Sequence, residues 1–178
     1  MNELEQLRFP IGHYEPSGTI TQEQRKQWIE EIGQLPAELY TAVDGLSEEQ
    51  LDTPYRDGGW TLRQVVHHIA DSHMNSYTRF KLAVTEDSPT VKPYYEDRWA
   101  ELADGAHAPI RLSLSLIEAL HERWFIFLQS LQPEQFERGF IHPEHGRTMT
   151  LGYVTGMYAW HGKHHVAHIT SLRERKGW

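Results

Sequence analysis

Four histidines lie within eight residues near the C-terminal end of the chain, in the segment WHGKHHVAHIT: His161, His164, His165 and His168. An α-helix turns by about 100° per residue, so on one helix these side chains fall within an arc of roughly 100°. Apolar side chains such as Val154 share that arc, which should therefore face the protein interior. A buried imidazole needs partners for its ring nitrogens. A transition-metal ion is one such partner, because histidine is the commonest metal ligand in proteins.

The spacing within this segment is that of a helical metal-binding pair. His161 and His165 are four residues apart, which places two imidazoles one turn apart on one helix face. His164 and His168 form a second pair with the same spacing. Helical geometry alone does not choose between the two pairs. The alternative for any single ring is a surface histidine or a hydrogen-bonded core histidine.

The segment that follows Trp60 offers a third ligand, because it carries His67, His68 and His73. On a helix, His68 lies about 110° from the centre of the apolar face and His67 about 150°. His68 is therefore the better inward candidate of the two neighbours. His73 lies closer to the apolar centre and is a rival; its alternative role is a core histidine that donates to a backbone carbonyl.

Two ligands from one helix and one from another would make a three-histidine site. Such a site leaves at least one coordination position for water or substrate, which is typical of a catalytic rather than a structural metal. A metal held in this way lowers the pKa of a water molecule or a thiol. Nitrogen ligands favour Zn²⁺, Ni²⁺ or Fe²⁺ over Mg²⁺ or Ca²⁺. We expect one divalent transition-metal ion per chain, with zinc first and nickel second.

Composition limits the other chemistries. The 178 residues suit a single domain spanning 1–178. The chain contains no cysteine, which excludes disulfides, cysteine-ligated zinc, iron–sulfur clusters and a cysteine nucleophile. Its formal net charge of -8 includes no basic stripe, so we expect no nucleic-acid partner. No apolar run resembles a signal peptide or a membrane span, which predicts a cytoplasmic protein without a membrane partner.

Four long helical patterns position the histidines, at about 21–43, 61–85, 109–131 and 151–173. Pro36 interrupts the first and should kink or split it. The first twenty residues predict an irregular arm, and a short helix is expected at about 96–102. Residues 139–146 are expected to be a loop. The run 139–142 within them is too short to show the alternation of a strand. Four helices joined by polar connections predict an all-α four-helix bundle.

Several stretches together resemble the DinB-like family, and within it the YfiT-type metal-dependent hydrolases of bacilli. They are the runs GGWTLRQVVHHIADSHMNSYTRFKLAVTE and KPYYEDRWAEL, the later YAWHGKHHVAHI, and the arm LRFPIGHYEP. The similarity covers nearly the whole chain. It implies an up-down-down-up bundle and a homodimer. It also implies a metal held by three histidines, one eight positions after a tryptophan on the second helix and two on the fourth; these correspond to His68, His161 and His165.

The resemblance leaves the reaction open. Members of the family are described as hydrolases, whereas others are thiol S-transferases that join bacillithiol, mycothiol or glutathione to electrophiles. Both activities imply a small-molecule substrate and a nucleophile, water or a low-molecular-weight thiol, that the metal activates. A third alternative is a non-catalytic metal-binding bundle with a role in damage response. The sequence assigns no catalytic residue beyond the ligands, and Asp71 and Glu144 are no more than candidates for a general base.

Overall fold

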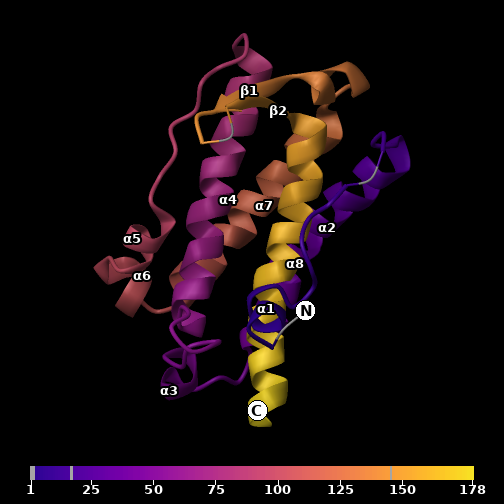
Figure 1. Ribbon diagram of the computed structural model, residues 1–178. Coiled ribbons are helices and arrows are strands. Elements are labelled where there is room, and N and C mark those ends of the chain that lie inside the picture. The colour runs from indigo at the N-terminus through magenta and orange to yellow at the C-terminus, as the bar shows by residue number, and fades with distance from the viewer. Residues whose placement is uncertain (1–2, 17, 145) are drawn as a thin grey trace.

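The computed structural model describes residues 3–16, 18–144 and 146–178, and its architecture is a four-helix bundle (Figure 1). The bundle helices are α2 (Gln22–Val43), α4 (Leu62–Thr85), α7 (Arg111–Ser130) and α8 (Leu151–Lys176). The smaller elements are α1 (Glu3–Arg8), α3 (Glu48–Leu51), α5 (Glu96–Ala100), α6 (Ala103–His107), the 3₁₀-helix η1 (Pro133–Glu137), β1 (Gly139–His142) and β2 (Arg147–Thr150). The predicted all-α bundle is confirmed.

The chain order of the bundle is up-down-down-up. Arg173, near the end of α8, donates to the carbonyls of Ala42 and Asp44 where α2 ends, so α2 and α8 end at the same pole. Arg138, which follows η1, donates to the Ala83 carbonyl near the end of α4. Because α7 runs directly into η1, α4 and α7 both end at the opposite pole. This is the predicted topology.

The first two bundle helices lie diagonally across the bundle from each other, and so do the last two. Helices α2 and α4 each pack against both α7 and α8. The pairs α2–α4 and α7–α8 are therefore diagonal, and each needs a long connection. The first connection carries α3, and the second carries η1 and the hairpin of β1 and β2 at the top of Figure 1.

Side-chain caps fix where the helices begin. Thr61 accepts a hydrogen bond from the backbone of Gln64, whose side chain accepts one in return from the backbone of Thr61. This reciprocal capping box starts α4. Thr150 caps α8 by accepting from the backbone of Tyr153. The positions of the histidines along both helices follow from these two starting points.

The first bundle helix passes through Pro36 without being split. Proline has no N–H, so the carbonyl of Ile32, four residues earlier, loses its helical partner. The ring of His121 on α7 replaces it, with Nδ1 at 2.6 Å from the Ile32 oxygen. A neighbouring helix thus satisfies the carbonyl that the proline frees.

Two parts of the chain differ from the sequence-based expectation. The arm is not wholly irregular, because it begins with α1. The segment expected to be loop forms the antiparallel hairpin β1–β2, with Gly139 opposite Thr150 and His142 opposite Arg147. Its first strand is buried at three of four positions, so it lacks the alternation that marks a strand in a sequence.

The apolar core is divided into two clusters, and most of the buried histidines lie between them. The cluster near the hairpin includes Phe80, Trp124 and Ala159, and the other includes Ala70, Ile117 and Ile169. Along α4, α7 and α8 the intervening buried residues include His73, His121, His164, His165 and His168. No helix within the described residues is long and apolar enough to cross a membrane.

Candidate metal centre

Helices α4 and α8 bring His68, His161 and His165 together. One ring nitrogen from each lies within 4.8 Å of the others. The Nε2 atoms of His68 and His161 are 3.4 Å apart. The ring centroids of His165 lie 4.5 Å from those of His161 and 4.7 Å from those of His68. These are the three residues that the family resemblance implies, and their binding of a metal ion stays a prediction.

The three rings have the chemistry of a nitrogen-ligand metal site. Burial lowers the pKa of His68 to about 3, helped by the charges that His164 and His168 would carry. Burial also holds the pKa of His161 and His165 well below 6.5. All three are therefore neutral at pH 7, as metal ligation requires. Zinc–nitrogen bonds of about 2.0–2.1 Å in a tetrahedron separate two ligand atoms by about 3.3–3.4 Å, which matches the His68–His161 spacing.

The group leaves room for a ligand from outside the chain. No fourth histidine, aspartate or glutamate joins it in the part of the chain that the structure describes. His164 belongs instead to an adjoining group with His165 and His168. An open position of this kind is typical of catalytic metal sites.

A cavity of about 480 Å³ opens onto the three histidines. Its wall comes from the N-terminal arm, the loop before α4, the start of α5 and one face of α8. Lining residues that the sequence did not single out are Arg8, Phe9, Arg56, Glu96 and Asp97. Trp60, from the loop, lies with its ring centroid 4.5 Å from that of His68 and covers one side of the site.

The N-terminal arm is held against α8 at several points, which makes it part of the cavity wall. The Arg8 carbonyl accepts from His168 Nε2 at 3.0 Å. The Gly12 carbonyl accepts from Trp160 Nε1 at 3.1 Å, and the hydroxyl of Tyr14 donates to the Tyr153 carbonyl. Residues that are distant in sequence from the histidines thus border the site.

The other histidines of α4 have different roles from those weighed in the sequence. His67 is buried like His68, rather than turned outward, and its ring bonds to Ser113 Oγ at 2.7 Å and to the Ala108 carbonyl at 2.9 Å. His73 joins neither ligand group of the described residues. Its ring bonds to two other histidines, His121 and His161, and not to a backbone carbonyl.

Neither carboxylate considered as a general base lines the cavity. Burial and the charge of Asp104 raise the pKa of Asp71 to about 6. Glu144 is exposed, 4.0 Å from His142 Nδ1. Glu96 does line the cavity, at its exposed rim, and its pKa is raised by partial burial and by the charges of Asp97 and Glu144.

The fold and the site define the class of protein, a helical bundle with a candidate three-histidine metal site. Its family follows from comparison with known proteins. The model of the DinB superfamily matches residues 31–169, and the chain belongs to this family.

Relatives from bacilli match over nearly their whole length. A protein of Bacillus mycoides (strain KBAB4), named a "putative metal-dependent hydrolase", is 57% identical over 98% of this chain and 100% of its own. YfiT of Bacillus subtilis (strain 168), which bears the same description, is 52% identical over 97% of each chain.

A solved structure has the same fold. It is that of YfiT from Bacillus subtilis, described as a "probable metal-dependent hydrolase with an unusual four-helix bundle topology". It superimposes with a TM-score of 0.95 at 51% identity and covers 97% of this chain and 99% of that one. The family expected from the sequence motifs is thus confirmed.

Proposed function

We propose that the chain is a metal-dependent hydrolase in which His68, His161 and His165 hold one divalent transition-metal ion, zinc or nickel. The observation that carries the proposal is the convergence of three neutral ring nitrogens within 4.8 Å, beside a cavity. The names of the bacillus relatives support the same reaction class.

Such an ion, when bound, lowers the pKa of a water molecule or a thiol and supplies a nucleophile at neutral pH. The residues of the chain would exclude water from the site and transfer the proton. Trp60 and Phe9 limit the access of water to the three histidines from the loop side and the arm side. Glu96 lines the cavity rim, and partial burial raises its pKa, so its carboxylate would be suited to take up the proton that the nucleophile loses.

The cavity indicates a small-molecule substrate. Its volume of about 480 Å³ is within the usual range of about 300–1,000 Å³ for small-molecule sites. Arg8 and Arg56 line it and can orient an anionic group on the substrate. The family resemblance adds a homodimer to the proposal, and the proposal keeps the cytoplasmic location that was expected from the sequence pattern.

Thiol S-transfer is the second candidate, and the same two arginines favour it. The chain contains no cysteine, so the thiol must be an external low-molecular-weight one. A thiol bearing carboxylates, such as bacillithiol, would place its charges at Arg8 and Arg56 while its sulfur reaches the three histidines. The thiolate would then attack an electrophilic carbon, and the leaving group would depart with the bonding electrons.

Metal analysis tests the site. His68→Ala, His161→Ala and His165→Ala should each lower the metal content of the purified protein from about one ion per chain, measured by mass spectrometry. His107→Ala is the matched control, because it removes an exposed histidine at the end of α6. Wild-type metal content in all three ligand variants would show that the assignment is wrong.

Two activity assays on the metal-loaded protein separate the candidates. One is a panel of activated esters and amides without thiol, and the other is bacillithiol with the electrophile monochlorobimane. Cleavage without thiol, lost in His161→Ala, supports the hydrolase. Conjugation that requires bacillithiol, lost in the same variant, replaces it with the transferase. Metal binding with neither reaction would indicate the non-catalytic bundle.

A further inference from the structure

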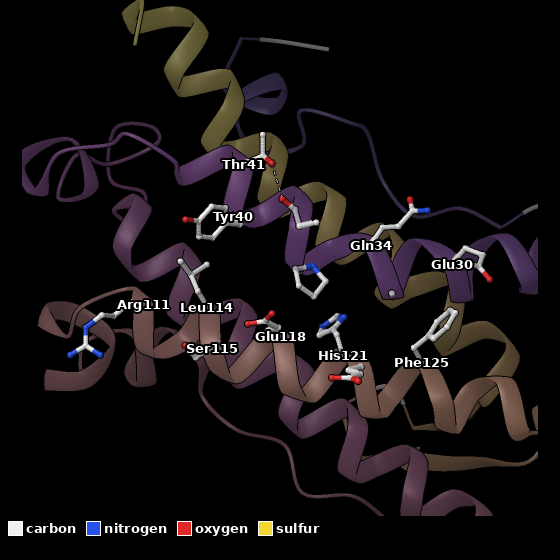
Figure 2. A pocket seen from close by; sticks show the side chains of 14 residues that line it. Glu30, Gln34, Tyr40, Thr41, Arg111, Leu114, Ser115, Glu118, His121 and Phe125 are labelled. Carbon is white, nitrogen blue, oxygen red and sulfur yellow. Dashed lines mark hydrogen bonds between the residues drawn. The ribbon is translucent and has the colours of Figure 1, made fainter.

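A chain of hydrogen bonds connects His161 to the carbonyl that Pro36 leaves free. His121 Nδ1 lies 2.6 Å from the Ile32 oxygen. His121 Nε2 lies 2.9 Å from His73 Nδ1, and His73 Nε2 lies 3.0 Å from His161 Nδ1. The chain thus passes from α2 through α7 and α4 to α8. Figure 2 shows His121 extending from α7 toward α2.

The carbonyl at one end sets the direction of every bond in this chain. A carbonyl oxygen can only accept, so the proton of His121 is on Nδ1. A neutral imidazole carries one N–H, and His121 Nε2 must therefore accept from His73 Nδ1. By the same rule His73 Nε2 accepts from His161 Nδ1. The lone pair of His161 is then on Nε2, the atom that faces His68 Nε2.

A second, shorter chain does the same for His165. His168 Nε2 donates to the Arg8 carbonyl at 3.0 Å, which leaves His168 Nδ1 as an acceptor. That atom is 3.3 Å from His165 Nδ1, so the His165 proton is on Nδ1 and its lone pair is on Nε2. This bond accounts for the close approach of His165 and His168 in the adjoining group without a second metal ion.

We propose that His73, His121 and His168 are positioning residues that fix the tautomer and the ring orientation of His161 and His165, so that both rings present Nε2 to the metal. The geometry carries this inference, because each chain ends on a backbone carbonyl whose role cannot reverse. The inference rests on the metal site proposed above, but the tautomers themselves belong to the metal-free protein.

This arrangement means that the site is organised before any metal arrives. A free imidazole divides its population between two tautomers and turns about its side-chain bonds. Here each ring is already held by a second histidine, so less ordering is needed on binding. Loss of such a partner typically weakens metal binding by about 10–100-fold.

The tautomers can be measured in the wild-type protein. Metal-free protein with ¹⁵N-labelled histidine should show, in long-range proton–nitrogen correlation spectra, the Nδ1–H form of His73, His121, His161 and His165. His168 should show the Nε2–H form. An Nε2–H signal from His161 or His165 would overturn the inference, and no variant has to fold for this test.

Zinc affinity, measured by competition with a chromogenic chelator, tests the consequence. His73→Phe and His168→Phe should each bind about 10–100-fold more weakly, while still taking up one ion per chain. His73→Gln should recover part of the loss, because its amide oxygen can still accept from His161 Nδ1. His67→Phe is the control: it removes a buried histidine with two hydrogen bonds that belongs to neither chain.

The outcomes separate this inference from the proposed function. Unchanged affinity in His73→Phe and His168→Phe, or an equal loss in His67→Phe, would show that the two chains do not position the ligands. No zinc binding by the wild-type protein would overturn the metal site itself. Normal zinc binding together with the wrong tautomers would overturn only the positioning role.

Discussion

The bond between His121 and the Ile32 carbonyl makes a quantitative prediction about Pro36. In the wild-type protein, His121→Leu removes the donor to the Ile32 oxygen. In a Pro36→Ala background the new N–H of residue 36 can donate to the same oxygen, as in an ordinary helix. The two substitutions should therefore be coupled in a double-mutant cycle on the free energy of unfolding.

The burial of both partners sets the size of the effect. Ile32 is 1% exposed and His121 is 0% exposed, so water cannot replace the lost donor. A buried group left without its partner costs about 1–3 kcal/mol. His121→Leu strands two such groups, the Ile32 carbonyl and His73 Nδ1, and should cost roughly 2–6 kcal/mol. With Ala at position 36, the Ile32 carbonyl keeps a donor when His121 is removed. His121→Leu should therefore cost about 1–3 kcal/mol less in the Pro36→Ala background than in the wild-type protein.

Urea denaturation of the metal-free wild-type protein, the two single variants and the double variant measures this coupling. His67→Leu in the same two backgrounds is the control, because the bonds of His67 go to Ser113 and Ala108 and not to α2. The effects of His67→Leu and Pro36→Ala on the free energy of unfolding should be additive within about 0.3–0.5 kcal/mol. Additivity of His121→Leu with Pro36→Ala would refute the argument that His121 serves the carbonyl freed by the proline.

Three further predictions follow from the buried groups. Removal of metal by a chelator should lower the melting temperature of the wild-type protein. The decrease should be roughly 5–10 °C, relative to a sample whose free metal concentration is 100 times the dissociation constant. The melting temperature of His161→Ala should not respond to the chelator. The metal-free protein should lose stability as the pH falls below about 6.5, because burial lowers the pKa of His68 to about 3 and of His121 to about 4. The unfolded chain then binds more protons, and each of these residues should cost on the order of 1 kcal/mol of stability at pH 5.5. A free energy of unfolding that stays level from pH 7.5 to pH 5 would contradict this. Arg63→Met should destabilise the protein by about 1–3 kcal/mol in urea denaturation, because the buried guanidinium donates to two carboxylates at 2.6 and 2.7 Å; Arg175→Met, at an exposed guanidinium, should cost less.

The helices could be predicted from the sequence because their signals are local. The spacing of apolar residues predicted α4 and α8 from about residues 61 and 151, and the prediction for α8 ended at about 173, near the observed Lys176. The hairpin could not be predicted. Its strands have four residues each, and the first is buried on both faces, so neither length nor alternation marked it.

The candidate ligands were partly accessible to sequence reasoning. Spacing on one helix identified two histidine pairs on α8, and the family resemblance was needed to favour His161 and His165 over His164 and His168. The inward position of His68 followed from its angle on the helix, whereas the burial of His67 depends on its contacts with residues after α6 and on α7. Such contacts between elements leave no periodic signal.

The chains of histidines could not be read from the sequence, because each joins residues from several elements. One observation pointed toward them: a proline inside an otherwise regular helix requires a partner for the carbonyl four residues before it. The sequence does not say which side chain supplies that partner. The arginines of the cavity were missed for a similar reason, because the folded arm and loop bring them to the site.

The two histidine chains also limit where protons can travel. Both end on backbone carbonyls, which neither release nor accept a transferable proton at neutral pH. A proton that enters His161 or His165 through its partner therefore has no exit at the far end, and neither chain conducts protons across the bundle. The groove of about 780 Å³ between α2 and α7, which His121 borders, is separated from His161 by this chain, whose outer end is held by the Ile32 carbonyl. For the reaction proposed above, the cavity on the side of the arm, which Glu96 lines, is the route that the two chains leave open to protons at His161 and His165.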